Sequence, residues 1–256
     1  MDAEAAEQRY RRQLDLAEIG PAGQARLGAA RVLLVGAGGL GAPAAFYLAA
    51  AGVGALGVVD YDVVDLSNLQ RQILYRTADV GALKARCAAG VLQALNPGVR
   101  VVVEPRALDA DNALALIAGY DFVVDATDSL ATKFLIADAC HFARKPYSHA
   151  GIQGFLGQTL TVLPGETACY RCVFGAPPPP EDPPATVRGP LGALPGVIGA
   201  IQATEALKQI LGIGRLLTDR LLVYDALTLT FREVAVQRHP QCPLCGSDPR
   251  LTSLHD

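Results

Sequence analysis

The chain has 256 residues, close to the upper limit for a single hydrophobic core, so we predict one domain spanning residues 1–256. Its 22 basic and 25 acidic residues give a net charge of −3, which excludes bulk electrostatic attraction to nucleic acid or to an anionic membrane. The N-terminal residues contain no apolar stretch of the signal-peptide type, and we therefore expect a cytoplasmic protein without nucleic-acid or membrane partners.

One uncharged run, from Val32 to Val59, is long enough to raise the question of a membrane-spanning helix. The run is interrupted by the sequence GAGGLGAP and by three further glycines. Glycines at this density disfavour one continuous helix, so the run is better explained as a buried strand, a turn, a helix and a second strand.

Short apolar runs alternate with longer helical segments after an N-terminal helical arm at residues 1–30. This alternation is typical of a mainly parallel sheet with helices on both faces. The predicted strands of this part are 31–35, 55–60, 100–104, 121–125 and 146–149, and the predicted helices are 40–51, 82–95 and 131–142.

The alternation stops in the last third of the chain. Residues 157–163 are predicted to form an added antiparallel strand, and strands at 221–225 and 231–236 complete an antiparallel C-terminal extension, with a helix at 197–211. The segment 176–190 is rich in proline, which lacks an amide donor, and it is predicted to be an exposed loop. The predicted fold class is α/β.

A glycine-rich turn follows the first predicted strand. Gly36, Gly38 and Gly41 form the pattern G-x-G-x-x-G between that strand and a helix, where bare amides and a helix N-terminus can face a phosphate. Asp60 ends the next strand, where an acidic side chain meets ribose hydroxyls in a Rossmann-like fold. The motif indicates a nucleotide without saying which one; the alternative is that the glycines only permit close packing.

Three further polar residues are predicted to lie on the same side of this site: Asn68, Arg71 and Lys84. If a helix begins near Gly81, Lys84 lies at its positive end, where a cation is unfavourable unless an anion is bound. A polyphosphate would supply that anion. The alternative is that both cations are solvated surface groups.

Asp128 follows a predicted strand in the sequence DATDS, near the carboxyl ends of the strands, where open α/β sheets bind ligands. Its carboxylate is suited to Mg²⁺ that bridges phosphates. The same spacing also suits a helix N-cap, and the sequence does not decide between the two roles.

Six cysteines are present, four of them in two C-x-x-C pairs. In a reducing compartment these pairs indicate a structural Cys₄ zinc site rather than disulfides, with redox dithiols or incidental cysteines as alternatives. The predicted ligands are Cys169, Cys172, Cys242 and Cys245. Cys87 and Cys140 are predicted to be buried packing residues, and no catalytic role is assigned to the histidines because they show no paired ligand spacing.

Taken in order, GAGGLG, Asp60, SNLQRQ, Lys84, DATDS and the two cysteine pairs resemble the MoeB/ThiF/HesA group of adenylyltransferases, which is related to ubiquitin-activating enzymes. The resemblance extends from RYRRQ at 9–13 to CPLCG at 242–246. It implies a nucleotide-binding core at 31–150 and a carrier-binding and zinc-binding part at 151–256. It also implies ATP-dependent adenylation of the C-terminal glycine carboxylate of a ubiquitin-like sulfur-carrier protein.

The resemblance assigns roles residue by residue. Gly38 and Gly41 approach the nucleotide and Asp60 holds the ribose. The resemblance implies that Asn68, Arg71 and Lys84 contact the phosphates and that Asp128 binds Mg²⁺. Arg12 matches an arginine that reaches into the partner subunit's nucleotide site, which implies a homodimer; the alternative is an exposed helical patch.

One departure from the group concerns covalent chemistry. Some members carry a cysteine in the loop before the GVIG-type helix, where this chain has Ala185 and no cysteine between Cys172 and Cys242. We therefore expect catalysis to stop at the acyl-adenylate, with sulfur delivered by a separate persulfide donor. The alternative functions are an NAD(P)-dependent oxidoreductase and a non-catalytic zinc-stabilised scaffold for a ubiquitin-like partner.

Overall fold

The structure is a computed structural model that describes residues 3–177 and 189–255. A single eight-stranded sheet runs through these residues, in the order β3-β2-β1-β4-β5-β6-β7-β8. The strands are β1 (Arg31–Val35), β2 (Ala55–Val59), β3 (Arg100–Glu104), β4 (Phe122–Asp125), β5 (Tyr147–Gln153), β6 (Leu156–Val162), β7 (Arg220–Asp225) and β8 (Thr230–Ala235). Ala185 falls outside the described residues.

The first five strands are parallel and the last three are antiparallel. β1 and β4 are buried along nearly their whole length, as expected for central strands covered on both faces. β8 is exposed at every position and forms one edge of the sheet. The predicted fold class, including its antiparallel C-terminal extension, is confirmed.

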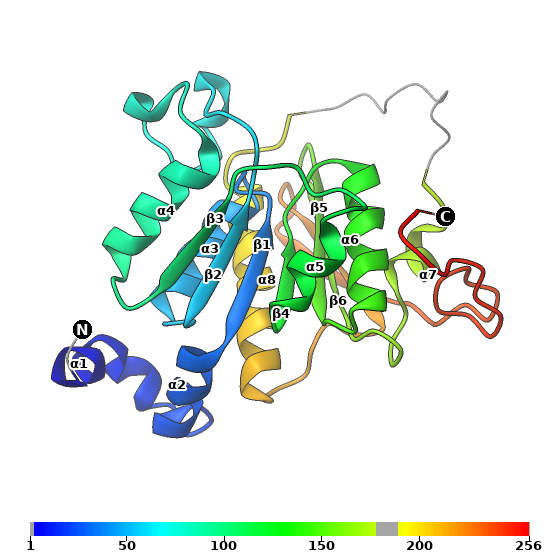
Figure 1. Ribbon diagram of the computed structural model, residues 1–256, viewed down its shortest axis with the longest axis horizontal. Helices are drawn as coiled ribbons and strands as arrows, with labels where there is room; N and C mark the ends of the chain where they lie inside the picture. The colour runs from blue at the N-terminus through cyan, green and yellow to red at the C-terminus, as the bar shows by residue number, and fades with distance from the viewer. Residues whose placement is uncertain (1–2, 178–188, 256) are drawn as a thin grey trace.

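Helices cover both faces of the sheet (Figure 1). α3, α4 and α8 pack on one face, and α5 and α6 pack on the other. The helices are α1 (Ala3–Leu14), α2 (Gly20–Ala29), α3 (Gly41–Ala50), α4 (Lys84–Leu95), α5 (Ala113–Ala118), α6 (Leu130–Phe142), α7 (Tyr170–Phe174) and α8 (Leu194–Leu211), with 3₁₀ turns η1 (Leu66–Asn68) and η2 (Thr77–Asp79). None of the described helices is long and apolar enough to cross a membrane.

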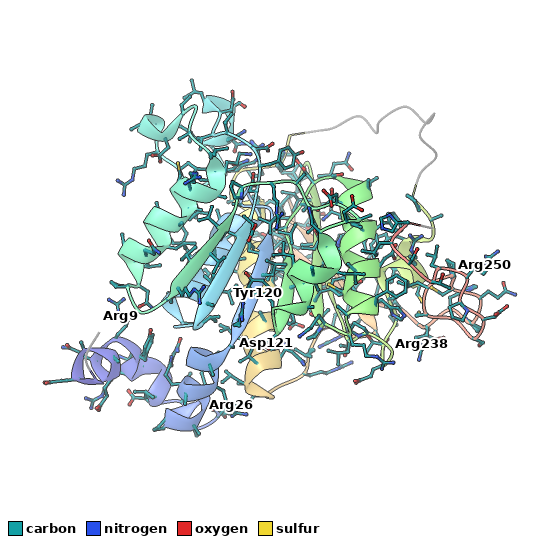
Figure 2. All side chains as sticks on the ribbon, viewed as in Figure 1. Arg9, Arg26, Tyr120, Asp121, Arg238 and Arg250 are labelled. Carbon is teal, nitrogen blue, oxygen red and sulfur yellow. The ribbon has the colours of Figure 1, made fainter. Side chains whose placement is uncertain are left out.

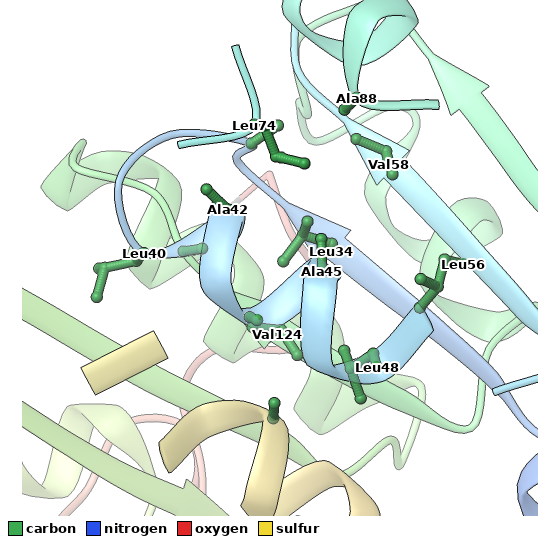
Figure 3. Close-up of a cluster of buried hydrophobic side chains, with 14 of the residues drawn as sticks. Leu34, Leu40, Ala42, Ala45, Leu48, Leu56, Val58, Leu74, Ala88 and Val124 are labelled. Carbon is green, nitrogen blue, oxygen red and sulfur yellow. The ribbon is translucent and has the colours of Figure 1, made fainter. Parts of the chain in front are cut away.

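The larger core lies between α3 and the sheet, as Figure 3 shows. Ala42, Ala45 and Leu48 of α3 face Leu34 and Val124 of the central strands. The small alanines let the helix approach closely, and full burial of each leucine or valine contributes roughly 1.5–3 kcal/mol. This packing fixes the start of α3 relative to the ends of β1 and β4.

The N-terminal arm, α1 and α2, is attached near the C-terminal end of α3. The Nε2 atoms of Gln13 and Gln24 both donate to the carbonyl of Ala51 (3.1 and 3.0 Å). Asn96 Nδ2 donates to the Tyr10 hydroxyl (2.8 Å) and to the carbonyl of Ala49 (2.7 Å). The arm therefore lies at the amino ends of the parallel strands, below the sheet in Figure 1.

The sequence analysis missed two short helices, α5 and α7. α5 has six residues and α7 has five, too few to give a clear helical period. α4 begins at Lys84 rather than near residue 82, and α8 begins three residues early at Leu194 because Pro195 is tolerated in a first helical turn.

Candidate nucleotide site and cysteine cluster

The glycine turn between β1 and α3 has a backbone that only glycine can adopt. Gly36 has φ of 93°, and a Cβ there would lie 2.8 Å from the carbonyl oxygen of Ala126. A Cβ on Gly41 would lie 2.0 Å from the carbonyl oxygen of Gly36. The close-packing role that the sequence left open is therefore present.

The same turn also offers free donors. Among the described residues, the backbone amides of Gly38, Gly39, Leu40 and Gly41 donate no hydrogen bond. They precede or begin α3, whose N-terminus carries a partial positive charge. Packing and anion binding are therefore compatible functions of one motif.

Asp60 is fixed beside this turn. One carboxylate oxygen accepts from the amide of Ala37 (2.8 Å) and the other from the amide of Asp62 (2.9 Å). Burial raises the pKa of Asp60, and these two amides offset only part of that effect. The carboxylate keeps lone pairs for further donors, which suits the predicted ribose contact.

Lys84 is the first residue of α4 and is buried, with 6% of its surface exposed. Its Nζ lies 2.9 Å from Asp62 Oδ2. The sequence analysis required an anion at this helix end, and Asp62 of the same chain supplies one. That analysis gave Asp62 no role. Asp62 is half exposed, so solvent screens this ion pair and makes it weaker than a fully buried pair.

The segment after η1 lies over the glycine turn. The Cγ of Arg71 and the Nε2 of Gln72 lie 3.5 Å from the positions that a Cβ would take on Gly39 and Gly38, respectively. Arg71 donates to the carbonyl of Ser67 (3.1 Å). Gln72 is buried and its Oε1 has no partner among the described residues, so it is a further polar group facing this site that the sequence analysis did not single out.

Asn68 has a local structural role. Its side-chain oxygen accepts from the amide of Asp65 (3.2 Å), which completes a capping box around η1. Its Nδ2 makes no hydrogen bond to the described residues, so the predicted phosphate contact stays a prediction.

Asp128 does not cap α6. The N-cap is Ser129, whose hydroxyl accepts from the amide of Thr132 (3.3 Å). Asp128 is exposed and makes no hydrogen bond or ion pair within the described part of the chain. It follows β4, two residues after Ala126, which approaches Gly36, so its free carboxylate is available for a cation near the glycine turn.

Among the described residues predicted to contact the nucleotide, Arg12 lies apart from the glycine turn. It is exposed on α1, which is attached at the far end of α3 from the glycine turn. The ten residues of α3 separate the two ends by about 15 Å.

The four paired cysteines form one cluster, with all their sulfur atoms within 4.8 Å of one another. Four of the Sγ to Sγ distances, one within a C-x-x-C pair and three between the two pairs, are 3.4 to 3.7 Å. Four thiolates about 2.3 Å from one zinc ion would have sulfur to sulfur edges near 3.8 Å, so these residues fit zinc. The amide of His239 donates to Cys172 Sγ (3.3 Å), as expected for a thiolate ligand.

The remaining cysteines lie apart from this cluster. Cys140 is fully buried, as predicted, whereas Cys87 is only partly buried on α4. Cys87 packs against the larger core and Cys140 belongs to the core on the other face of the sheet, which agrees with a packing role.

Comparison with known proteins agrees with this arrangement. The model of the ThiF family matches residues 10–244. The sulfur carrier protein adenylyltransferase of Thermus thermophilus is 49% identical over 254 residues, covering 97% of this chain and 94% of that protein. The SAMP-activating enzyme E1 of Haloferax volcanii is 49% identical over 239 residues, covering 93% of this chain and 88% of that protein.

Two further similarities concern a longer relative and the fold. The adenylyltransferase and sulfurtransferase MOCS3 of Mus musculus is 49% identical, but this chain spans only 54% of its length. The crystal structure of E. coli MccB superposes with a TM-score of 0.83 over 97% of this chain and 75% of that one, at 21% identity, which supports the fold alone. The chain belongs to the ThiF family and is an adenylyltransferase of the MoeB/ThiF/HesA group, as its motifs predict.

Proposed function

We propose that the chain uses ATP to adenylate the C-terminal glycine carboxylate of a ubiquitin-like sulfur-carrier protein, with release of pyrophosphate. One observation carries the proposal: the segments that follow β1, β2 and β4, three adjacent parallel strands, carry free amides, two cations and a free carboxylate. Two relatives support it by their names, sulfur carrier protein adenylyltransferase and SAMP-activating enzyme E1.

The reaction follows from the charges of these groups. A C-terminal carboxylate is ionised at neutral pH, so it can attack the α-phosphorus of ATP without a general base. The main obstacle is repulsion between anions. Arg71 and Lys84 would offset charge on the phosphoryl oxygens as pyrophosphate leaves, and Asp60 would hold the ribose.

Mg²⁺, held by Asp128, would neutralise phosphate charge when bound. The four clustered cysteines would hold one zinc ion with no open coordination position, so its role is structural. In that role it would join the tail after β8 to α7.

The working unit is proposed to be a homodimer in which Arg12 of one protomer completes the nucleotide site of the other. The position of Arg12 on α1, remote from its own glycine turn, supports this assignment. The cytoplasmic location stays a prediction from the sequence.

The acyl-adenylate is the proposed end of this chain's own chemistry. Zinc would occupy the sulfurs of the clustered cysteines, Cys140 is buried, and Cys87 is partly buried against the larger core. A separate persulfide donor would therefore supply sulfur to the activated carrier.

Carrier-dependent exchange of pyrophosphate with ATP tests the proposed function. A small ubiquitin-like protein ending in Gly-Gly should support exchange, and the same protein without its last glycine should not. The proposal would be contradicted if no carrier of the sulfur-transfer class supported exchange. It would also be contradicted if the truncated carrier supported exchange at the same rate as the intact carrier.

A further inference from the structure

Asp125, Lys133 and His149 form a buried charged cluster at the end of β4, three residues before Asp128. Asp125, Lys133 and His149 are 1%, 4% and 1% exposed, respectively. Lys133 Nζ lies 3.2 Å from both carboxylate oxygens of Asp125, and His149 Nδ1 lies 2.9 Å from Asp125 Oδ2. The three residues come from β4, α6 and β5, so the cluster joins three elements.

The cluster fixes the backbone that leads to Asp128. Both the amide and the hydroxyl of Thr127 donate to Asp125 Oδ1 (3.1 and 2.8 Å). Gln202 Nε2 of α8 donates to the carbonyl of Asp125 (2.8 Å), and Lys133 Nζ donates to the carbonyl of Ala150 (2.6 Å). Hydrogen bonds from residues of β4, α6, β5 and α8 thereby fix the turn after β4. Asp128 is the next residue after this turn, and its carboxylate is exposed to solvent.

Fold stability alone does not account for this arrangement. Removing two charges from water costs several kcal/mol per ion, and well-packed apolar residues of similar volume are often equally stabilising. Burial by itself would raise the pKa of Asp125, but Lys133 and His149 lower it to about 2, so the carboxylate stays charged at neutral pH. A charged acceptor binds the Thr127 hydroxyl more strongly than a neutral one does.

We propose that Asp125, Lys133 and Thr127 are positioning residues that hold Asp128 in the orientation required for Mg²⁺ bound to ATP. The proposal rests on the proposed function. The Asp128 side chain is exposed and makes no hydrogen bond or ion pair with the described residues, so its position depends on the turn that precedes it. That turn also contacts Gly36, so the same cluster sets the distance between Asp128 and the phosphate-binding amides.

The test compares ATP affinity in Mg²⁺ with ATP affinity in EDTA, by calorimetry on the full chain without carrier. Thr127→Val removes the hydroxyl at nearly constant volume, whereas Thr127→Ser keeps it. The gain in affinity from Mg²⁺ should fall about tenfold in Thr127→Val and stay within about twofold of the wild type in Thr127→Ser. Ser129→Ala is the matched control, because it removes the α6 cap and lowers the unfolding temperature without changing the Mg²⁺ gain.

Lys133→Met removes the ammonium itself and should abolish the Mg²⁺ gain if the variant folds. If it does not fold, the two Thr127 variants decide. An unchanged Mg²⁺ gain in Thr127→Val, or no Mg²⁺ gain in the wild type, would overturn the proposal. These results are distinct from failure of the proposed function, which is the absence of carrier-dependent pyrophosphate exchange in the wild-type chain.

Discussion

Lys84 and Arg71 differ in how the fold holds them. Lys84 is buried at the first turn of α4 and paired with Asp62, whereas Arg71 is partly exposed and makes one hydrogen bond to backbone. Phosphates arriving at the glycine turn would meet one cation whose position is fixed and one that can adjust. Both should stabilise charge that develops as pyrophosphate leaves.

Arg71→Ala and Lys84→Ala should each lower carrier-dependent exchange by more than about tenfold, the size expected for loss of one charge-stabilising group. Arg86→Ala is the control, because Arg86 is exposed on the same helix. Near-normal exchange in both site variants would remove these residues from the mechanism.

Two glycines provide a matched pair for the glycine turn. A Cβ on Gly41 would lie 2.0 Å from a backbone oxygen, whereas Gly90 is exposed on α4 and a Cβ there would meet no atom within 4 Å beyond the neighbouring backbone of its own helix. Gly41→Ala should lower the free energy of unfolding by roughly 1–3 kcal/mol and weaken ATP binding. Gly90→Ala should raise it by about 0.5–1 kcal/mol. Urea unfolding measures both, and equal effects would contradict the assigned role of Gly41.

His149 gives a pH-dependent signature. Burial, with a contribution from the Lys133 ammonium, lowers the pKa of His149 to about 4. In the unfolded chain its pKa is about 6.5, so between these values only the unfolded state binds the proton. The free energy of unfolding should fall as pH falls through this window, by about 1.4 kcal/mol per pH unit from this group.

Urea unfolding at several pH values between 7 and 5 should show a shallower pH dependence for His149→Gln than for the wild type. Asp125, whose pKa is lowered to about 2, loses its contribution only below this window. The Tyr170 and Phe174 rings that contact His149 do not titrate here. Parallel curves for the two proteins would show that His149 is not held neutral.

At the scale of elements, α7 illustrates how a short segment depends on its partners. It has five residues, too few for a stable isolated helix; Cys169 is its N-cap and Cys172 lies within it. Tyr170 and Phe174 project from it onto the His149 ring, with centroid distances of 4.7 and 5.4 Å. The cysteine cluster and the buried charged cluster are therefore joined through α7.

Metal analysis of protein purified without chelators should find about one zinc per chain. Removing the metal should lower the unfolding temperature, because the tail after β8 loses its attachment to α7. No zinc, together with four freely titratable thiols in this cluster, would exclude the site.

Periodic elements were predictable and short ones were not. The strands from β1 to β8 and the helices α3, α4, α6 and α8 have apolar patterns long enough to recognise from sequence. The glycines, Asp60, Arg71, Lys84 and the cysteines follow spaced motifs. Asp62, Lys133 and His149 have no such spacing, because their partners come from other elements and are known only once the sheet order is known.

For the whole molecule, the arm and the cysteine cluster lie at opposite ends. Figure 2 shows Arg9 of α1 at one end and Arg238 and Arg250 of the tail at the other. The arm is attached at the end of α3 remote from the glycine turn, so an arm that completes a nucleotide site would complete that of a second copy. A closed two-fold dimer would provide two equivalent sites of this kind.

Mixing two inactive variants tests that arrangement. In a mixed dimer of Arg12→Ala with Lys84→Ala chains, one of the two sites would have both side chains intact. Random reassociation should therefore restore about one quarter of wild-type exchange activity. If the two variants are shown to exchange subunits and the mixture still lacks pyrophosphate-exchange activity, Arg12 does not act in the partner's site.

Intact mass spectrometry of the carrier tests carboxylate adenylation most directly. A Gly-Gly-ended carrier incubated with the chain, ATP, Mg²⁺ and pyrophosphatase should gain the mass of one AMP moiety and lose it on treatment with hydroxylamine. The carrier without its last glycine should gain nothing. Pyrophosphate release with no AMP on the carrier, or instead a thiol-sensitive adduct between chain and carrier that survives denaturation, would contradict this account.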